Sequence, residues 1–304
     1  MEPWVIALVA VSAVLHLAWN VRLKTAGDPL RAATIGMLAA SVGIVPLGFA
    51  VWWVQGHVTL PVEGVALGVA SGFVEAAYFI LLSAAYRRGD LSVVYPVARG
   101  TAPLLAVLIG VVVLGERLGV PGSIGVVMLL AGFLILQRPW RAFALARTSG
   151  GGAAGARKAA ADSAILFALA TGVMIATYTA IDRVGTQQID VLVYAAILWA
   201  TCSIVLVLWV ALVAGGDLLR YGPAAARRAA VGGWLTLIAY LCILVALSVA
   251  PLSGVAPLRE SATVFAAAWG SVRLGEASDR SEAVRRIGAS ALIVGGALLL
   301  AVGS

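Results

Sequence analysis

Charged side chains are scarce in this sequence: Asp, Glu, Lys and Arg make up 12% of its 304 residues, whereas 62% of the residues are hydrophobic. A soluble domain carries roughly a quarter charged residues, because water must solvate its surface. The shortage of charge therefore excludes an ordinary soluble protein. Apolar runs of about 20 residues, separated by short polar stretches, indicate membrane-spanning helices instead.

Cysteine and histidine are nearly absent as well, with two residues of each. Cys202 and Cys242 fall within apolar runs, and together with His16 and His57 they match neither a zinc site nor a disulfide framework. The sequence also contains no phosphate-binding loop, no His-Glu-x-x-His and no Gly-x-Ser-x-Gly. These absences lead us to expect no metal, no cofactor and no enzymatic activity.

The apolar runs predict an all-α membrane protein with ten transmembrane helices. They cover residues 4–23, 30–54, 64–86, 91–114, 120–137, 163–181, 189–213, 232–249, 253–274 and 284–302. The polar residues 138–162, with three consecutive glycines, are typical of a flexible linker. The chain therefore divides into a first five-helix repeat (1–137), this linker and a second five-helix repeat (163–304). The first run lacks a basic leader, so we expect it to be retained as a helix.

A short pattern occurs once in each half. Arg99 is followed 17 residues later by Glu116 within Leu-Gly-Glu, and Arg259 is followed 17 residues later by Glu276 within the same triplet. Because five helices are an odd number, the second repeat must enter the membrane in the opposite orientation to the first. Such inverted repeats are typical of secondary transporters, whose sites lie near the bilayer midplane between the repeats.

The basic residues predict the orientation in the membrane. Of the 21 Lys and Arg residues, 17 lie in the loops after the first, third, fifth, seventh and ninth runs, and only Arg117 and Arg183 lie on the opposite face. Loops rich in Lys and Arg remain in the cytoplasm. We therefore expect an inner-membrane protein with residues 138–162 in the cytoplasm and both termini outside. The net charge of +7 reflects this bias and does not indicate nucleic-acid binding.

The two remaining basic residues, Arg99 and Arg259, lie inside predicted helices. Four prolines accompany them and are expected to interrupt these helices: Pro96, Pro103, Pro251 and Pro257. Interrupted helices at matching positions of two repeats indicate a transporter site, and a guanidinium can bind a carboxylate or phosphate through two hydrogen bonds. We expect both arginines to bind substrate. The alternative is that Arg99 only pairs with Glu75 to hold two helices together.

Other polar residues within the apolar runs complete the predicted site, because such groups are costly in a membrane. The further substrate-binding candidates are His16, Trp19, Asn20, Glu75, Tyr78, Tyr95, Tyr240 and Glu260. Glu75 is the candidate for proton coupling, since a buried carboxyl group can exchange a proton during transport; alternatively, it is a fixed counter-ion for Arg99. His16 equally fits a hydrogen bond between helices. Glu116 and Glu276 are expected to fix loops at helix ends.

These residues resemble a known family. The segments His16–Asn20, Tyr86–Gly100 and Leu114–Arg117, with weaker counterparts at Pro257–Arg259 and Leu274–Glu276, are similar to EamA-type members of the drug/metabolite transporter superfamily. The resemblance implies an inner-membrane carrier, often an exporter, that moves small organic metabolites by alternating access between its third, fourth, eighth and ninth helices. It does not imply a particular substrate.

Three functions from different classes fit the sequence. The first is a carrier in the lipid bilayer, monomeric or homodimeric, for a small organic molecule, which needs a closed central cavity lined by Arg99, Glu75 and Tyr95. The two arginines favour an anionic or zwitterionic cargo, and protons are the coupling ion if Glu75 titrates. The second is a flippase or scramblase of a lipid-linked intermediate, which needs a groove open to the bilayer. The third is a membrane subunit without transport, which needs no cavity between the repeats.

Overall fold

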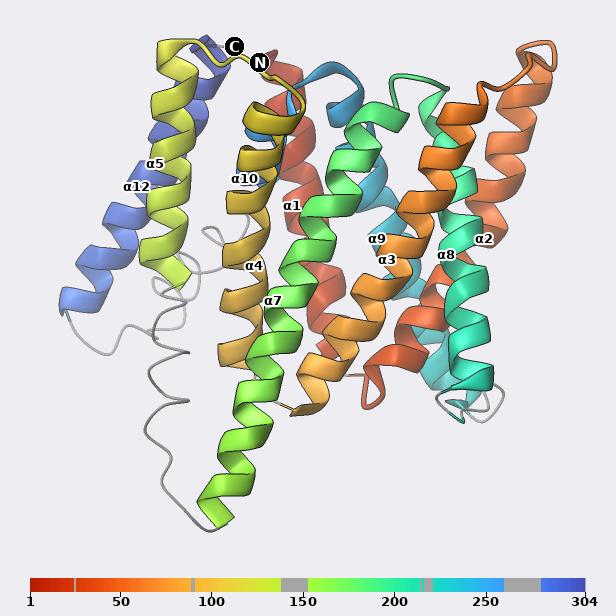
Figure 1. Ribbon diagram of the computed structural model, residues 1–304, viewed down its shortest axis with the longest axis horizontal. Helices are drawn as coiled ribbons and strands as arrows, with labels where there is room; N and C mark the ends of the chain where they lie inside the picture. Colours follow the sequence, from red (N-terminus) through yellow and green to blue (C-terminus); the bar gives the residue numbers. More distant parts are fainter. Residues whose placement is uncertain are drawn as a thin grey trace.

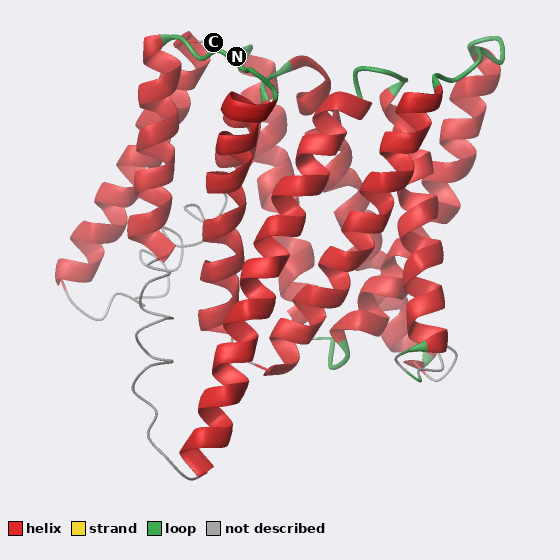
Figure 2. Ribbon diagram, in the orientation of Figure 1, coloured by secondary structure: helices red, strands yellow, loops and turns green. Residues whose placement is uncertain are grey.

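The computed structural model describes residues 1–24, 26–88, 91–137, 153–213, 215, 221–259 and 280–303, and within these ranges it contains helices and no strand. The helices are α1 (Pro3–Lys24), α2 (Pro29–Val54), α3 (Val62–Arg88), α4 (Leu91–Leu108), the π-helix η1 (Ile109–Val113), α5 (Val120–Gln137), α7 (Ala153–Gly185), α8 (Val191–Leu212), α9 (Pro223–Val249), α10 (Leu252–Arg259) and α12 (Arg280–Gly303). They lie side by side, with the loops gathered at two opposite ends (Figures 1 and 2). The expected all-α fold is confirmed.

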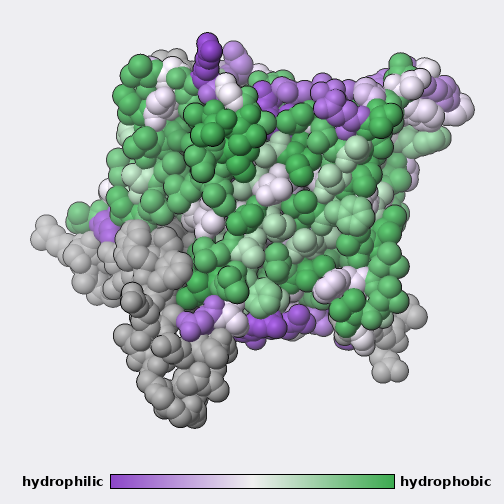
Figure 3. Space-filling model, in the orientation of Figure 1, coloured by the Kyte–Doolittle hydropathy of each residue, from purple (hydrophilic) through white to green (hydrophobic). Residues whose placement is uncertain are grey.

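Several of these helices are suited to a membrane. Five are long and apolar enough to cross it: α2, α3, the Asp162–Gly185 part of α7, α8 and α9. Shorter apolar helices cover Pro3–His16, Val97–Val113 and Val120–Ile135. On the face shown in Figure 3, a hydrophobic band lies between hydrophilic residues at the two ends. Such a surface suits lipid around the middle of the molecule and water at its ends.

Capping residues in the turns determine where two of the helices begin. Asp28 precedes α2, where its Oδ1 accepts a hydrogen bond from Arg31 N at 3.2 Å and Pro29 occupies the first turn. Asp190 caps α8 in the same way, accepting from Leu192 N at 2.8 Å. A carboxylate at these positions satisfies amide groups that the first helical turn leaves without partners. The short polar stretches therefore fix where the apolar helices begin.

Two helices are longer than the apolar runs that predict them. Helix α7 begins at Ala153 instead of residue 163, so it includes the end of the predicted linker, and it continues to Gly185 instead of residue 181. Helix α9 begins at Pro223 instead of residue 232. Both extensions are rich in alanine, the residue with the highest intrinsic helix propensity. Hydropathy identifies the part of a helix that is in the membrane and omits such polar turns at its ends.

The helices of the two halves pack in a symmetrical pattern. Helix α1 packs on α9 and α3 packs on α7; α2 packs on α8, α4 on α10, and α5 on α12. Further pairs are α2 with α9 and α3 with α8, and α4 with α7 and α1 with α10. If helices at matching positions of the halves are exchanged, these pairs are unchanged. Two repeats related by a two-fold axis give such a set of pairs, and sites then form along the axis.

The two ends of the molecule differ in charge. Both termini lie together at one end (Figure 1), which we call the terminal end. The opposite end holds the last turns of α1 and α3 and the first turns of α2 and α9, which carry Arg22, Arg88, Arg31 and Arg228. We call it the basic end. It is the end that the positive-inside rule predicts to face the cytoplasm, and this orientation stays a prediction.

Small residues allow helices of the two halves to approach closely. A Cβ atom added at Gly233 in α9 would overlap the backbone of Gly36 in α2, so the two glycines touch directly. Glycine pairs of this kind are common where membrane helices cross, because they let the backbones pack against each other. The neighbouring Gly232 differs, since a Cβ atom there would meet nothing within 4 Å.

Candidate functional site

A cluster of buried charged and hydroxyl-bearing side chains lies where the two halves meet. Its members are His16, Glu75, Tyr78, Arg99, Tyr178, Asp182, Tyr240 and Arg259, from helices α1, α3, α4, α7, α9 and α10. Arg99 and Arg259 are each 5% exposed, Glu75 is 3% exposed, and Asp182 is fully buried. Ionisable groups at such a depth are costly unless partners stabilise them. We call this set the polar cluster.

Arg259 connects helices of both halves. Its Nη2 donates a hydrogen bond to His16 Nε2 in α1 at 3.0 Å and approaches Tyr178 OH in α7 at 3.5 Å. Its Cζ atom lies 5.1 Å from the centroid of the Tyr240 ring in α9, within the range of a cation–π interaction. The last residue of α10 is therefore joined to three other helices.

Arg99 belongs to the same cluster. It lies in α4 and is close enough to His16, Tyr78 and Tyr178 to interact with them electrostatically. Arg259 interacts with the same three side chains. The two arginines, which the sequence places at matching positions of the repeats, thus share one set of neighbours in the centre of the structure.

The Asp182 carboxylate is surrounded by three hydroxyl donors. Its Oδ1 accepts hydrogen bonds from Ser71 Oγ at 2.5 Å and from Tyr194 OH at 2.8 Å, and its Oδ2 accepts one from Tyr240 OH. The three donors come from α3, α8 and α9, while Asp182 itself is in α7. Three hydroxyl donors satisfy an ionised carboxylate in the way that water would. This contact therefore holds four helices together around one negative charge.

Glu75 has a different environment. It follows Ser71 by one helical turn in α3 and interacts electrostatically with Asp182 and Arg259. Its Oε2 is buried and accepts no hydrogen bond from the described residues. An oxygen in this state is costly when the carboxyl group is ionised, because neither water nor a donor solvates it. Of the two buried carboxyl groups, Glu75 is thus the one whose charge the surroundings support less.

The structure brings together most of the residues that the sequence singles out. His16, Glu75, Tyr78, Arg99, Tyr240 and Arg259 all lie in the polar cluster, and the Trp19 ring lies 5.2 Å from that of His16. Of Asn20 and Tyr95, only the backbone is described, in α1 and α4; Glu260 and Glu276 lie outside the described residues. The alternative role of Arg99, a direct pair with Glu75, is not among the ion pairs found between described residues.

Sequence reasoning missed Asp182 and two of its three donors, Ser71 and Tyr194, whereas the third donor, Tyr240, was predicted as a site residue. The predicted helix ended at residue 181, so Asp182 and the adjacent Arg183 looked like the first residues of a loop. Helix α7 instead continues to Gly185, which leaves Asp182 buried inside it. The sequence does contain a signal that Asp182 belongs to the site: Tyr178 and Asp182 are one helical turn apart and therefore share a face of the helix.

The four prolines have different surroundings. Helix α4 passes through Pro96 and Pro103 and then continues into the π-helix η1. In the second half, Pro251 separates α9 from α10, and Pro257 lies inside α10. The π-helix loosens the winding of the chain a few residues after Pro103, as π-bulges often do near functional sites. Whether the prolines bend their helices remains a prediction.

Glu116 crosses from the first half to the second. Gly115 adopts a positive φ of 67°, which ends η1 and turns the chain back. The Glu116 carboxylate then accepts hydrogen bonds from Leu252 N at 2.6 Å and from Ser253 N at 2.9 Å and Oγ at 2.6 Å. Arg183 Nε lies 3.7 Å from the same carboxylate. Glu116 therefore caps the first turn of α10 at the terminal end, as an acidic group at a helix N-terminus should.

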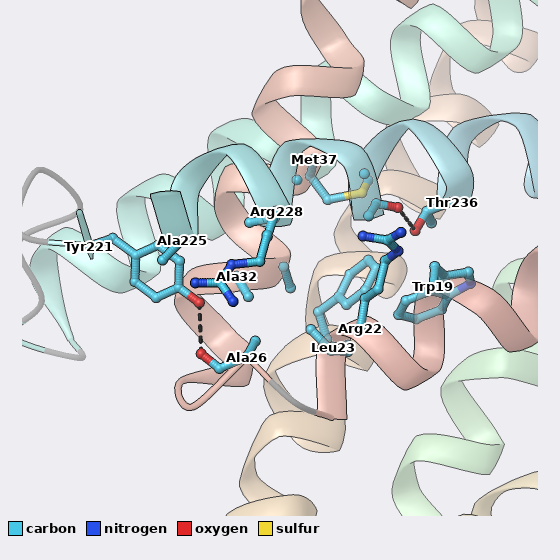
Figure 4. A pocket seen from close by; sticks show the side chains of 16 residues that line it. Trp19, Arg22, Leu23, Ala26, Ala32, Met37, Tyr221, Ala225, Arg228 and Thr236 are labelled. Atoms are coloured by element: carbon cyan, nitrogen blue, oxygen red, sulfur yellow. Dashed lines mark hydrogen bonds between the residues drawn. The ribbon is translucent and has the colours of Figure 1, made fainter. Parts of the chain in front are cut away.

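A cavity of about 230 Å³ opens beside the polar cluster, between α1, α2 and α9 (Figure 4). Its wall includes the small residues Ala32, Ala33, Gly36, Ala229, Gly232 and Gly233. Trp19, Met37 and Phe79 form its buried side, and Arg22 and Arg228 line it at the basic end. Beside Arg259, described residues of α4, α7 and α10 line a void of about 10 Å³. The larger cavity therefore lies next to the polar cluster, and neither Arg99 nor Glu75 lines it.

The sequence and fold were compared with known proteins. The model of the EamA-like transporter family matches residues 3–138 and 162–302, once in each half. Among solved structures, one described only as the crystal structure of a protein matches with a TM-score of 0.70 at 20% identity, covering 98% of this chain and 98% of its own. At that identity the likeness shows the fold alone. No curated protein matches the chain significantly.

Removal of one donor from Asp182 should destabilise the fold. Tyr194→Phe deletes the hydroxyl that donates to Asp182 Oδ1 and leaves a buried carboxylate with two donors. A hydrogen bond to a charged group contributes about 1.5–3 kcal/mol, so we expect a loss of that size in the free energy of unfolding in detergent. Tyr221→Phe is the matched control, because Tyr221 OH donates only to the neutral Ala26 carbonyl. An equal loss in both variants would contradict a special role for Asp182.

Loss of the Glu116 cap should loosen the terminal end. Glu116→Gln keeps the shape of the side chain but replaces one acceptor oxygen by a donor amide, which cannot accept from Leu252 N. We expect a loss of about 1 kcal/mol in the free energy of unfolding, the typical contribution of a helix cap. Glu63→Gln, an exposed change in the first turn of α3, should have a much smaller effect.

The same variant should also expose the start of α10. Ala250, just before α10, is 3% exposed. In a chain without Cys202 and Cys242, a cysteine at this position should react faster with a water-soluble maleimide when Glu116→Gln is present. Equal labelling rates with and without Glu116→Gln would show that the cap does not close this end.

Proposed function

Because the chain belongs to the EamA-like transporter family, we propose that it is a secondary carrier of a small organic metabolite, acting by alternating access across the inner membrane. The observation that carries this proposal is the polar cluster: two arginines and two carboxyl groups buried where the repeats meet. In inverted-repeat transporters, the substrate site lies at this interface. A subunit without transport has no need for charges that are so costly to bury.

The distribution of free space supports alternating access. The cavity beside the polar cluster opens at the basic end, while the Glu116 contacts close the terminal end. A carrier in one of its two states is open on one side of its site and closed on the other. With the basic end in the cytoplasm, this conformation is the inward-open state of an exporter that loads its cargo from inside the cell, with both termini outside.

The charges of the site favour an anionic or zwitterionic cargo. Arg99 and Arg259 both act electrostatically on His16 and Tyr178, so their two positive charges attract a carboxylate to the same part of the site, where it can accept charge-assisted hydrogen bonds from a guanidinium group. Such charge-assisted hydrogen bonds are about twice as strong as neutral ones and fix the orientation of a planar group. The alternative of a lipid flippase is less favoured, because a cavity of about 230 Å³ holds a small molecule and not a lipid-linked intermediate.

Transport should depend on the two buried arginines. A purified sample is first screened by thermal shift against a panel of metabolites, because a ligand of the native state raises its stability; uptake of the best binder is then measured in proteoliposomes. Arg99→Gln and Arg259→Gln should each reduce uptake about ten- to a hundredfold, the loss of one charge-assisted contact. Arg117→Gln, an exposed change near the terminal end, is the control. Uptake unchanged in both buried variants would disprove the site.

Glu75 is proposed to couple transport to protons. If it releases and takes up a proton during the cycle, Glu75→Gln should remove the pH dependence of uptake and the accumulation driven by a proton gradient, while exchange of cargo across the membrane continues. Glu2→Gln, an exposed change at the N-terminus, should retain both. Proton-driven accumulation that persists in Glu75→Gln would exclude this role and leave Glu75 as a structural counter-charge.

A further inference from the structure

We propose that the cavity between α1, α2 and α9 is a binding site for a small amphipathic organic anion, in which Arg22 and Arg228 hold the acidic group and the buried aromatic side holds the apolar body. This inference rests on the proposed carrier function for its place in the cycle: the cavity is where the cargo binds before it reaches the polar cluster. The binding itself can be measured without transport.

The first argument is the charge of the cavity wall. Arg22 comes from the last turns of α1, and Arg228 comes from the first turns of α9, so the two halves contribute one guanidinium each. Figure 4 shows both side chains on the same cavity. None of the described residues that line it is acidic. An anion at this place is attracted by two positive groups, whereas a cation is repelled.

The second argument is a donor without a partner. The Trp19 side chain is 4% exposed and lines the cavity, and its Nε1 finds no hydrogen-bond partner among the described residues. A buried N–H group left without an acceptor is costly, and each such group in a native structure calls for an explanation. Nε1 itself is shielded from the cavity that the Trp19 side chain borders, so an acceptor oxygen of a bound ligand reaches this N–H group only after the indole ring turns.

The third argument is the shape of the site. Met37 and Phe79 are 1% and 2% exposed and give the cavity an apolar inner surface. Its volume of about 230 Å³ is below the range of roughly 300–1,000 Å³ that holds drug-sized ligands. Nucleotides and lipids are therefore too large to fit. A monocarboxylate with one ring, or with a branched chain of similar size, suits both the volume and the two kinds of surface.

The position of Trp19 connects this cavity to the polar cluster. The Trp19 ring packs edge-on against His16, with ring centroids 5.2 Å apart, and His16 accepts a hydrogen bond from Arg259. One aromatic side chain thus separates the cavity from the buried guanidinium groups. A ligand held against Trp19 lies next to the site that the carrier uses.

Binding is tested with three probes that separate charge from shape. Phenylacetate has the acidic group and the apolar body, phenylacetamide has the same body without the charge, and acetate has the charge without the body. We expect phenylacetate to bind the purified protein in nanodiscs of zwitterionic lipid, as measured by calorimetry and by a rise in the unfolding midpoint. The other two probes should bind at least tenfold more weakly. Equal binding of phenylacetate and phenylacetamide, or binding of neither, would overturn the proposal.

Two kinds of variant locate the site. Gly232→Leu should abolish phenylacetate binding, because Gly232 lines the cavity and a side chain there meets no atom within 4 Å, so it can fill the space. Gly288→Leu in α12 is the matched control, since a Cβ atom there also meets nothing and the residue is far from the cavity lining. Arg228→Gln, an exposed change that should fold normally, should weaken binding about tenfold. Unchanged affinity in Gly232→Leu and Arg228→Gln would place the ligand elsewhere.

Three further outcomes identify the occupant of the cavity and distinguish this inference from the proposed carrier function. If phosphatidylglycerol in the nanodiscs competes fully with phenylacetate and stabilises the protein without it, the two arginines bind a lipid headgroup, and the cavity is not a metabolite site. If uptake in proteoliposomes is normal in Gly232→Leu, the carrier function stands and this inference fails. If phenylacetate binds as expected but no cargo is transported, the inference stands and the carrier function fails.

Discussion

A charge inside a membrane protein needs a partner, because hydrocarbon offers neither water nor counter-ions. The fold depends on this constraint at Asp182, where hydroxyl groups from three other helices surround one carboxylate. Apolar contacts between membrane helices discriminate poorly between neighbours, since lipid tails are as apolar as leucine side chains. A carboxylate that requires three donors does discriminate: it fixes how α3, α7, α8 and α9 lie relative to each other. The same four helices also carry Glu75, Tyr178 and Tyr240 and so position much of the polar cluster.

The contacts that join the two halves differ in strength between the terminal end and the basic end of the molecule. At the terminal end, Glu116 of the first half caps α10 of the second half and lies near Arg183, so three segments meet around one carboxylate. At the basic end, α1, α2 and α9 leave a cavity between small residues. Glu116 and Asp182 each accept three hydrogen bonds, but those of Glu116 are part-buried and those of Asp182 are fully buried, where an unpaired charge is costlier. Motion between the repeats should therefore break the first contact and keep the second.

The sequence predicts the fold well because its signal is physical and local. Long apolar runs predict membrane helices, and isolated polar residues within them are expected to face protein. The sequence therefore predicts that Arg99, Arg259 and Glu75 belong to one site. It does not predict Asp182, because this residue follows the apolar run directly and its donors lie far away in the chain: Ser71 precedes it by 111 residues and Tyr240 follows it by 58. The partner of Glu116 was equally hidden, 136 residues along the chain. The cavity depends on three helices from both halves, and no local pattern encodes such a space.

In the proposed carrier, the positions of the arginines allow an anion to move from the cavity to the polar cluster without a large barrier. Arg22 and Arg228 lie near water, where a charge pair is screened and binds weakly. Arg259 is buried, and its hydrogen bonds to His16 and Tyr178 involve neutral acceptors. An arriving carboxylate can replace such an acceptor, so that the guanidinium exchanges a neutral partner for a charged one and is never left without an acceptor. Trp19 must shift for this exchange, because its ring lies between the cavity and His16. In the proposed carrier, the side chain that borders the cavity is therefore also the one that controls access to the buried site.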